Sequence, residues 1–290
     1  MSFVLPARAK INLSLDILGL LPGGYHRLET VMQSLAWHDR LLFSTKSEGV
    51  TFSCDSKHVP SGQDNLVCRA AALVQKESGL KRGAHIHLEK RIPVAAGLAG
   101  GSADAAATLL GLNRLWGLNW PEEKLLEMGA RLGSDVPFCL VGGTVLARGR
   151  GELLTSVPPL PPMGVILVKP PINVSTADVY HNYDRRRVEQ KQYTPNLIAA
   201  IKNNDFEGIC RSLGNALEVV TISMHPIIDN LKKALLAAGA AGVLMSGSGP
   251  AVYGLAANFE TARKIAGQLV PPAGTEVIAT WTVKNLNSSN

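Results

Sequence analysis

One glycine-rich stretch in the first half of the chain constrains the fold more than any other feature. Its residues run Pro93-Val94-Ala95-Ala96-Gly97-Leu98-Ala99-Gly100-Gly101-Ser102-Ala103. An apolar segment with strand character, Ala84 to Leu88, precedes it. Apolar residues recur behind it at the spacing of one helix face, up to a stop at Gly117: Leu109, Leu112, Leu115 and Trp116. The sequence therefore predicts a strand, a glycine loop, and a helix that begins within the loop.

A loop of this kind suits an anionic ligand. The first turn of a helix has unpaired N–H groups and a partial positive charge. Glycine lets a phosphate approach the backbone closely, and Ser102 adds a hydroxyl within reach of a phosphate or Mg²⁺. We interpret the loop as a cradle for the phosphates of a nucleotide. The alternative, a start of small residues that permits close helix packing, has equal weight for a glycine loop taken alone.

Two well-known phosphate loops are excluded by the spacing. A Walker A loop ends in Gly-Lys-Ser/Thr, whereas Gly101 is followed directly by Ser102. The dinucleotide fingerprint requires three glycines at G-x-G-x-x-G spacing, but position 99 is alanine. The loop therefore belongs to another class.

Length and composition predict two soluble domains. The chain has 290 residues, of which 46% are hydrophobic and 18% charged, as in folded soluble proteins. The proline-rich segment Pro158 to Pro162 resembles a linker, so we place the domains at 1–160 and 161–290. Helices that flank a few strands in the second half indicate an α+β domain.

Charge and cysteine content limit the partners. The net charge of +6 is compatible with an anionic ligand, and the one compact basic run, 185–187, fits a solvated face better than a nucleic-acid surface. Four distant cysteines form no C-x-x-C pair, and neither a signal peptide nor an apolar span is present. We expect a cytoplasmic protein, a monomer or weak homodimer, that binds neither nucleic acid nor membrane. His85 and His87 alternate in a strand and lack a third ligand nearby, so no metal site of the chain is expected.

Polar residues near the N-terminus are candidates for a binding site. Ile11 to Ile17 alternates apolar and polar residues, which places Lys10 and Asn12 on one face of a strand. That face either looks into a cleft or, for Lys10, into solvent. Tyr25 and His26 follow a turn and could stack on a base and bind its edge, or serve as packing and surface residues.

Three further segments admit both a structural and a functional interpretation. Asp135 lies in the turn Gly133–Phe138, either as a cap or as a carboxylate beside a transferring phosphoryl group. Arg150 is a phosphate contact or a hairpin charge. Ser246-Gly247-Ser248-Gly249-Pro250 joins two predicted strands, as a mobile functional turn or an ordinary hairpin loop.

The order of these segments resembles the GHMP kinase superfamily. Pro93 to Ala106 is similar to its second motif, and Gly247 to Pro250 to its third. Within the superfamily, the resemblance is closer to the kinases of the non-mevalonate isoprenoid pathway that act on 4-diphosphocytidyl-2-C-methyl-D-erythritol. It covers Pro6 to Leu255 and rests on four segments: Ala9–Leu13, Gly24–His26, Gly133–Phe138 and Gly149–Glu152.

The resemblance implies a two-domain α+β fold, with an N-terminal domain like the second domain of ribosomal protein S5 and a ferredoxin-like C-terminal domain. It implies ATP, with Mg²⁺, as the phosphoryl donor to the 2-hydroxyl of the methylerythritol moiety. Lys10 and Asp135 match the catalytic pair, with Asp135 as the base and Lys10 holding it and offsetting charge. Asn12 would contact the substrate, and Arg150 its diphosphate.

The remaining roles follow from the same resemblance. Tyr25 and Tyr180 would sandwich cytosine, and His26 would bind its edge. The stretch from Pro93 to Ala103 would hold ATP, with Gly100, Gly101 and Ser102 nearest the phosphates. Gly23 stands where the family usually has an aspartate, so a hydrogen bond from that residue is missing.

Two other functions stay open. One is a GHMP kinase for another substrate, such as homoserine or mevalonate. The other is a nucleotide-binding regulator that has lost catalysis. The presence of both Lys10 and Asp135 argues against the regulator, because a degenerate member would be expected to lose one of them.

Overall fold

The computed structural model describes residues 2–60, 62–186 and 191–284. The chain forms two compact units that alternate along the sequence. The first comprises residues 1–9, 37–94 and 99–141, and the second comprises residues 10–36, 95–98 and 142–290. The predicted domain boundary after residue 160 lies within the last segment of the second unit and stays a prediction.

Strands of the first unit pair around β5 (Gly83–Glu89). It runs antiparallel to the second half of β3 (His26–Lys46), from Arg40 opposite Glu89 to Lys46 opposite Gly83. On its other side it runs parallel to β4 (Val50–Cys54). The strand β1 (Ser2–Asn12) also pairs with β3, and its first residues belong to this unit.

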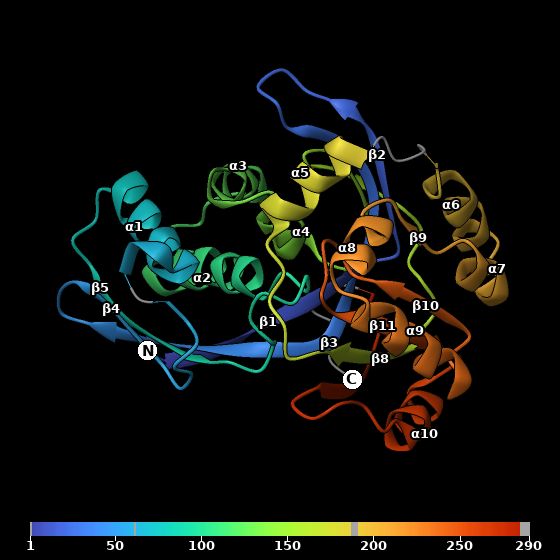
Figure 1. The fold of residues 1–290 in the computed structure, drawn as a ribbon. Helices are drawn as coiled ribbons and strands as arrows, with labels where there is room; N and C mark the ends of the chain where they lie inside the picture. The colour runs from blue at the N-terminus through green and yellow to red at the C-terminus, as the bar shows by residue number, and fades with distance from the viewer. Residues whose placement is uncertain (1, 61, 187–190, 285–290) are drawn as a thin grey trace. The chain divides into compact units, whose positions relative to one another are not determined.

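Helices of the first unit gather around α2 (Gly100–Trp116), whose side chains are buried on nearly all sides. A short 3₁₀ turn, η1 (Gly62–Asp64), leads into α1 (Leu66–Ser78), which lies beside α2 (Figure 1). The helices α3 (Glu122–Leu132) and α4 (Val136–Val141) also contact α2. Gly111 allows β3 to approach, because a Cβ there would lie 2.2 Å from the Phe43 ring. The predicted helix with its stop at Gly117 is confirmed, with Gly117 in the left-handed region at φ 63°.

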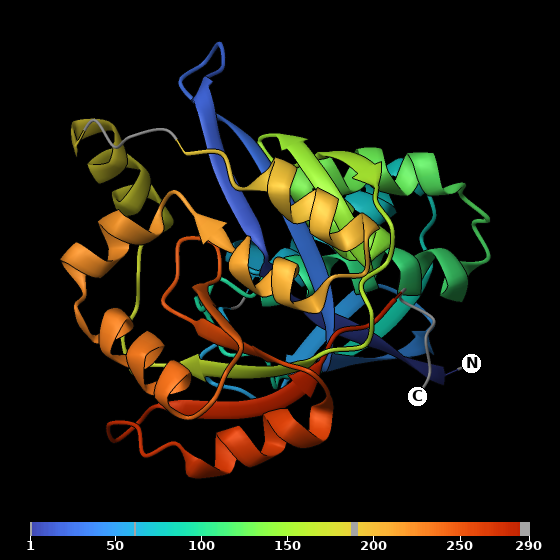
Figure 2. The same ribbon diagram turned by 90° about the vertical axis from the view of Figure 1, so that its right-hand side faces the viewer.

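The second unit contains a four-stranded antiparallel sheet in the order β10-β11-β8-β12. Its strands are β8 (Gly164–Lys169), β10 (Gly242–Met245), β11 (Val252–Ala256) and β12 (Glu276–Trp281). The helices α9 (Ile227–Ala237) and α10 (Phe259–Gln268) cover one face of this sheet (Figure 2). On that face Ile166, Val168 and Val252 pack in one core with Leu231 and Ile265. The two predicted strands around Ser246–Pro250 are confirmed as the antiparallel pair β10 and β11.

The other face of this sheet is attached to the end of β1. Side chains alternate along β11, so Tyr253 points away from the face that carries Val252. Tyr253 is fully buried and its hydroxyl donates to the Asn12 carbonyl oxygen at 2.9 Å. Burial raises the pKa of Tyr253 well above its usual value, which keeps the hydroxyl a donor. The sheet therefore fixes the segment that carries Lys10 and Asn12.

The rest of the second unit consists of short strands and helices. Antiparallel to the first half of β3 run β2 (Ser14–Leu20) and β6 (Thr144–Gly149), while β9 (Gly214–Asn215) is parallel to β2. The hairpin partner of β6 is β7 (Leu153–Ser156). The remaining helices are α5 (Thr176–Arg186), α6 (Thr194–Lys202), α7 (Phe206–Arg211) and α8 (Glu218–Met224). The side chains of the basic run 185–187 lie outside the described part of the chain.

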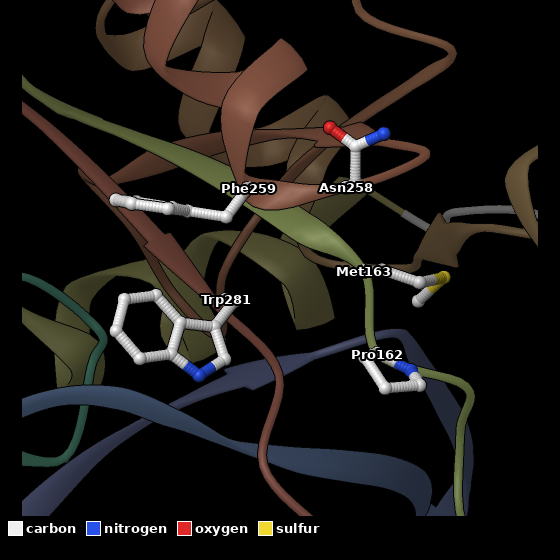
Figure 3. A pocket seen from close by; sticks show the side chains of 5 residues that line it. All are labelled: Pro162, Met163, Asn258, Phe259 and Trp281. Atoms are coloured by element: carbon white, nitrogen blue, oxygen red, sulfur yellow. The ribbon is translucent and has the colours of Figure 1, made fainter. Parts of the chain in front are cut away.

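An apolar cavity of about 350 Å³ opens in the second unit (Figure 3). Its lining residues are Pro162, Met163, Asn258, Phe259 and Trp281. The Phe259 and Trp281 rings meet edge to face at 4.8 Å. Asn258 is the N-cap of α10, and its side-chain Oδ1 accepts the Thr261 N–H at 2.9 Å. None of the residues predicted for the site lines this cavity. Among the described residues, no helix is both long and apolar enough to cross a lipid bilayer.

Candidate active site

A buried lysine is at the centre of the polar residues in the second unit. Lys10 is 4% exposed, so its solvent-facing interpretation is wrong. Its ammonium donates to the Asn12 side-chain oxygen at 2.7 Å and to the Gly97 carbonyl oxygen at 3.0 Å. The Asn12 side-chain nitrogen, Nδ2, donates in turn to Thr30 Oγ1 at 2.9 Å. Lysine is rarely buried, because its charge loses hydration, so Lys10 is a candidate site residue.

The glycine loop meets the loop Ser246–Pro250 through the Gly97 carbonyl. Ser246 Oγ donates to this oxygen at 2.9 Å, so it accepts from both Lys10 and Ser246. Gly97 has φ +78°, and a Cβ there would lie 2.3 Å from the Ser246 carbonyl oxygen. Position 97 therefore requires glycine, both for its backbone conformation and for the close approach of the second loop. The segments predicted from separate motifs meet here.

Asn215 holds the Ser246–Pro250 loop in place. Its side-chain nitrogen donates to the Met245 and Gly247 carbonyl oxygens at 2.9 and 2.7 Å. Its side-chain oxygen accepts the Leu217 N–H at 2.9 Å, so the buried amide is satisfied at both ends. A Cβ on Gly247 would lie 3.6 Å from Lys10 Nζ, which shows how near the fixed loop lies to the ammonium. Sequence reasoning missed Asn215, because it lies outside every motif.

The residues predicted to bind cytosine and the diphosphate contact one another in pairs. The His26 ring stacks on Tyr180 with centroids 4.8 Å apart, and its Nε2 lies 2.7 Å from Asp184 Oδ1. Tyr25, at the tip of the turn between β2 and β3, is 60% exposed, and the Arg150 guanidinium lies 5.3 Å from its ring centre. Asp184 is a further candidate that the sequence did not indicate, since only the fold of α5 places it beside His26. All five residues belong to the second unit.

Asp135 belongs to the first unit, in the turn that joins α3 to α4. Its carbonyl oxygen accepts the Cys139 N–H at 3.1 Å, so Asp135 has the backbone position of a helix cap for α4. The predicted turn ends earlier than Phe138, because α4 begins at Val136 and a helix tolerates Pro137 in its first turn. The Asp135 side chain is half-buried. Its catalytic role stays a prediction.

The helix that follows the glycine loop begins without a side-chain cap. Ala99 precedes α2 in the left-handed region at φ 56° and makes no capping hydrogen bond with its side chain. Gly100, Gly101 and Ser102 form the first turn, where N–H groups lack helical partners. Such a start leaves donors for an external acceptor such as a phosphate oxygen. Residues 93–94 and 99–103 belong to the first unit and residues 95–98 to the second.

Metal ligands do not cluster in the described part of the chain, where no group of three His, Cys, Asp or Glu side chains could hold an ion. His85 and His87 instead bond to β4, with His85 Nδ1 2.9 Å from Thr51 Oγ1 and His87 Nδ1 2.8 Å from Ser53 Oγ. The expected strand-face role of both histidines is confirmed.

Comparisons with known proteins agree with this architecture. The family model described as "GHMP kinases N terminal domain" matches residues 65–143, and "GHMP kinases C terminal" matches residues 197–271. The chain therefore belongs to the GHMP kinases. Its α+β two-domain fold is the predicted one.

The relatives are kinases of one named type. The chain is 51% identical to a 4-diphosphocytidyl-2-C-methyl-D-erythritol kinase of Pelotomaculum thermopropionicum, over 90% of this chain and 92% of the relative. It is also 51% identical to the enzyme of the same name from Moorella thermoacetica, over 91% and 94% of the two chains. A crystal structure of 4-(cytidine 5'-diphospho)-2C-methyl-D-erythritol kinase superposes with a TM-score of 0.84 at 34% identity, covering 97% of this chain and 99% of that one.

Proposed function

We propose that this chain transfers the γ-phosphoryl group of ATP to the 2-hydroxyl of 4-diphosphocytidyl-2-C-methyl-D-erythritol. The observation that carries the proposal is 51% identity, over nine-tenths of the chain, to kinases named for this substrate. The Lys10, Gly97 and Ser246 contacts support it, because they join three motifs of the superfamily around one ammonium.

In this reaction the substrate O–H bond breaks and its oxygen attacks the γ-phosphorus, while the bond to the β-phosphate oxygen breaks and ADP leaves. Asp135 is the proposed base that accepts the hydroxyl proton. Lys10 supplies positive charge toward the transferring group. Mg²⁺ would neutralise charge on the ATP phosphates, and Ser102 is the hydroxyl of the loop suited to assist it.

Substrate recognition is proposed for the aromatic residues and their neighbours. Tyr25 and Tyr180 would stack on cytosine, and His26 would bind its edge. Asp184 fixes the orientation of the His26 ring through the 2.7 Å contact. Asn12 would contact the methylerythritol end, and Arg150 the diphosphate.

ATP would bind along residues 93–103, with its phosphates at Gly100, Gly101 and Ser102. We propose the cytoplasm as the compartment, because all four cysteines, each of them in the described part of the chain, are free thiols. The proposed partner is the small-molecule substrate, bound by a monomer or a weak homodimer.

A substrate panel with coupled ADP detection tests the proposal. We expect turnover with the diphosphocytidyl substrate and none with homoserine or mevalonate. Turnover with one of those two instead would assign the chain to a different GHMP kinase, and ATP binding without turnover on any compound would support the regulator.

The base is tested by Asp135→Ala, with Asp135→Asn as the variant of matched shape. We expect kcat to fall by about 10²–10⁴-fold in both, while ATP still binds. Near-normal kcat in either variant would remove Asp135 from the role of base.

A further inference from the structure

A second buried lysine lies beside the start of α2 in the first unit, outside every role proposed so far. The Lys90 side chain is 7% exposed. Its ammonium donates to Asp39 Oδ2 at 2.5 Å and to Asp104 Oδ2 at 2.7 Å. A Cβ on Gly100 would lie 2.9 Å from the same nitrogen, so the ammonium occupies the space beside the first residue of α2.

The two carboxyl groups connect Lys90 to β3, to residues 91–92 and to α2. Asp39 comes from β3, and its other oxygen accepts the N–H groups of Arg91 and Ile92 at 2.5 and 2.7 Å. Those residues are the last before the glycine stretch begins at Pro93. Asp104 comes from the second turn of α2. The cluster of Asp39, Lys90 and Asp104 therefore fixes the chain immediately before the stretch and the helix immediately after it.

The cluster has two carboxyl groups for one ammonium. The Asp104 side chain is 5% exposed, and its Oδ1 is buried without a hydrogen-bond partner. A net negative charge buried in this way is costly, so the cluster favours one bound proton at neutral pH. Burial raises the pKa of Asp104 to about 8. The charge of Lys90 lowers this pKa, and the charge of Asp39 raises it further. Burial lowers the pKa of Lys90, but the two carboxylates outweigh it and raise that pKa.

Other titratable groups near the cluster come from the end of β4. Asp55 Oδ1 accepts the backbone N–H of Lys90 at 2.9 Å. The charges of Lys90 and Asp104 also act on the Cys54 thiol, whose pKa is raised mainly by burial. Within the cluster we assign the proton to Asp104, because its Oδ1 has no hydrogen-bond partner, whereas Asp39 accepts hydrogen bonds at both oxygens.

We propose that Lys90 and Asp104 are positioning residues that hold the start of α2 in the geometry that binds the phosphates of ATP. The inference rests on the proposed function, in which the start of α2 binds ATP. Neither Lys90 nor Asp104 contacts the reacting atoms in the proposed reaction. The neutral acid lets Lys90 anchor the helix without placing a net negative charge beside the phosphates.

Calorimetric titration of the full chain with ATP tests this, using Asp104→Ala and Asp104→Asn. The alanine variant removes the acceptor that joins Lys90 to α2 and leaves Asp39, and we expect the Kd for ATP to rise about tenfold. Asparagine resembles the neutral acid and keeps an acceptor oxygen, so its Kd should stay within about twofold at neutral pH. Glu77→Gln is the control, because the exposed pair of Glu77 with Arg131 in the same unit lies outside the cluster.

The pH dependence gives a second reading if Asp104→Ala does not fold. Above the pKa of about 8, Asp104 acquires a charge that repels ATP, so the Kd of the unmodified chain should rise relative to that of Asp104→Asn. Parallel pH profiles, an unchanged Kd in a folded alanine variant, or equal losses in both variants would each overturn the inference.

Failure of this inference is distinguishable from failure of the proposed function. ATP titration needs no phosphoryl acceptor, so a chain that binds ATP as described but phosphorylates no panel compound loses only the proposed function. A chain that phosphorylates the diphosphocytidyl substrate, yet binds ATP equally well with alanine at position 104, loses only the inference.

Discussion

Lys10 and Lys90 are both buried, but their surroundings differ. Lys90 lies between two carboxyl groups, and its charge is compensated where it lies. Lys10, within its own unit, donates to the Asn12 side-chain oxygen and to the Gly97 carbonyl oxygen. The contacts of Lys90 tie β3 to α2, whereas those of Lys10 tie the end of β1 to the glycine loop, where we propose that its ammonium offsets charge during the reaction. Burial of a lysine alone therefore does not identify its role.

The largest effect should come from Lys10→Met. Methionine keeps the length of the side chain and removes its charge, so we expect kcat to fall by about 10²–10³-fold. Steady-state kinetics with ADP detection measure this. Lys233→Met on α9 is the control, because Lys233 is 72% exposed and pairs only at the surface with Asp229. A kcat within tenfold of normal would break the contrast between the two lysines.

Lys90→Met should act on stability rather than on the chemical step. It leaves two buried carboxyl groups without their cation, so the free energy of unfolding should fall by about 3–5 kcal/mol. Urea denaturation followed by circular dichroism measures the change. Adding Asp104→Leu should recover part of the loss by removing one of these unpartnered buried polar groups, and a failure to do so would argue against them as its cause.

Asn215→Ala should produce a smaller, local loss. The substitution leaves the carbonyl oxygens of Met245 and Gly247 without their donor, which costs about 1–3 kcal/mol of unfolding free energy. Because the freed loop carries Ser246, we also expect kcat to fall about tenfold. Asn230→Ala, at an exposed position of α9, is the control. Equal effects of the two substitutions on kcat would contradict a positioning role for Asn215.

The last comparison concerns stability against pH. Asp104 binds its proton more tightly in the folded chain, where its pKa is about 8, than in the unfolded chain, where it is near the usual 3.8. Its contribution to stability is therefore complete below the lower value and is lost as the pH rises through the higher one. We expect thermal melts to show a decline with pH in this window that Asp104→Asn lacks. An identical slope in both proteins would place the proton elsewhere.

The sequence predicted those parts of the fold that depend on neighbouring residues. The helix from Gly100 to Trp116 follows from its apolar period and from Gly117, and the β10–β11 pair from two short apolar runs around a turn. Lys10, Asn12, Gly97 and Ser246 were indicated by motifs, and their meeting in one unit follows from the family's fold.

Partners distant in sequence could not be predicted. Asn215 lies 30 and 32 residues from the carbonyls it holds, and Lys90 lies 51 residues from Asp39. The alternation along Ile11–Ile17 also places Asp16 on the polar face, and Asp16 is buried and accepts the N–H groups of Tyr193 and Thr194, at the start of α6, at 2.8 and 3.0 Å. Alternation indicates which residues share a face but not what lies opposite it.

The carbonyl oxygen of Gly97 has a mechanical consequence. Because one oxygen accepts from both the Lys10 ammonium and the Ser246 hydroxyl, rotation of that single peptide plane would loosen two contacts at once. A ligand that displaces residues 95–98 would therefore move the Lys10 ammonium and the Ser246 hydroxyl together. Ligand binding at this loop and the orientation of the ammonium would then be coupled.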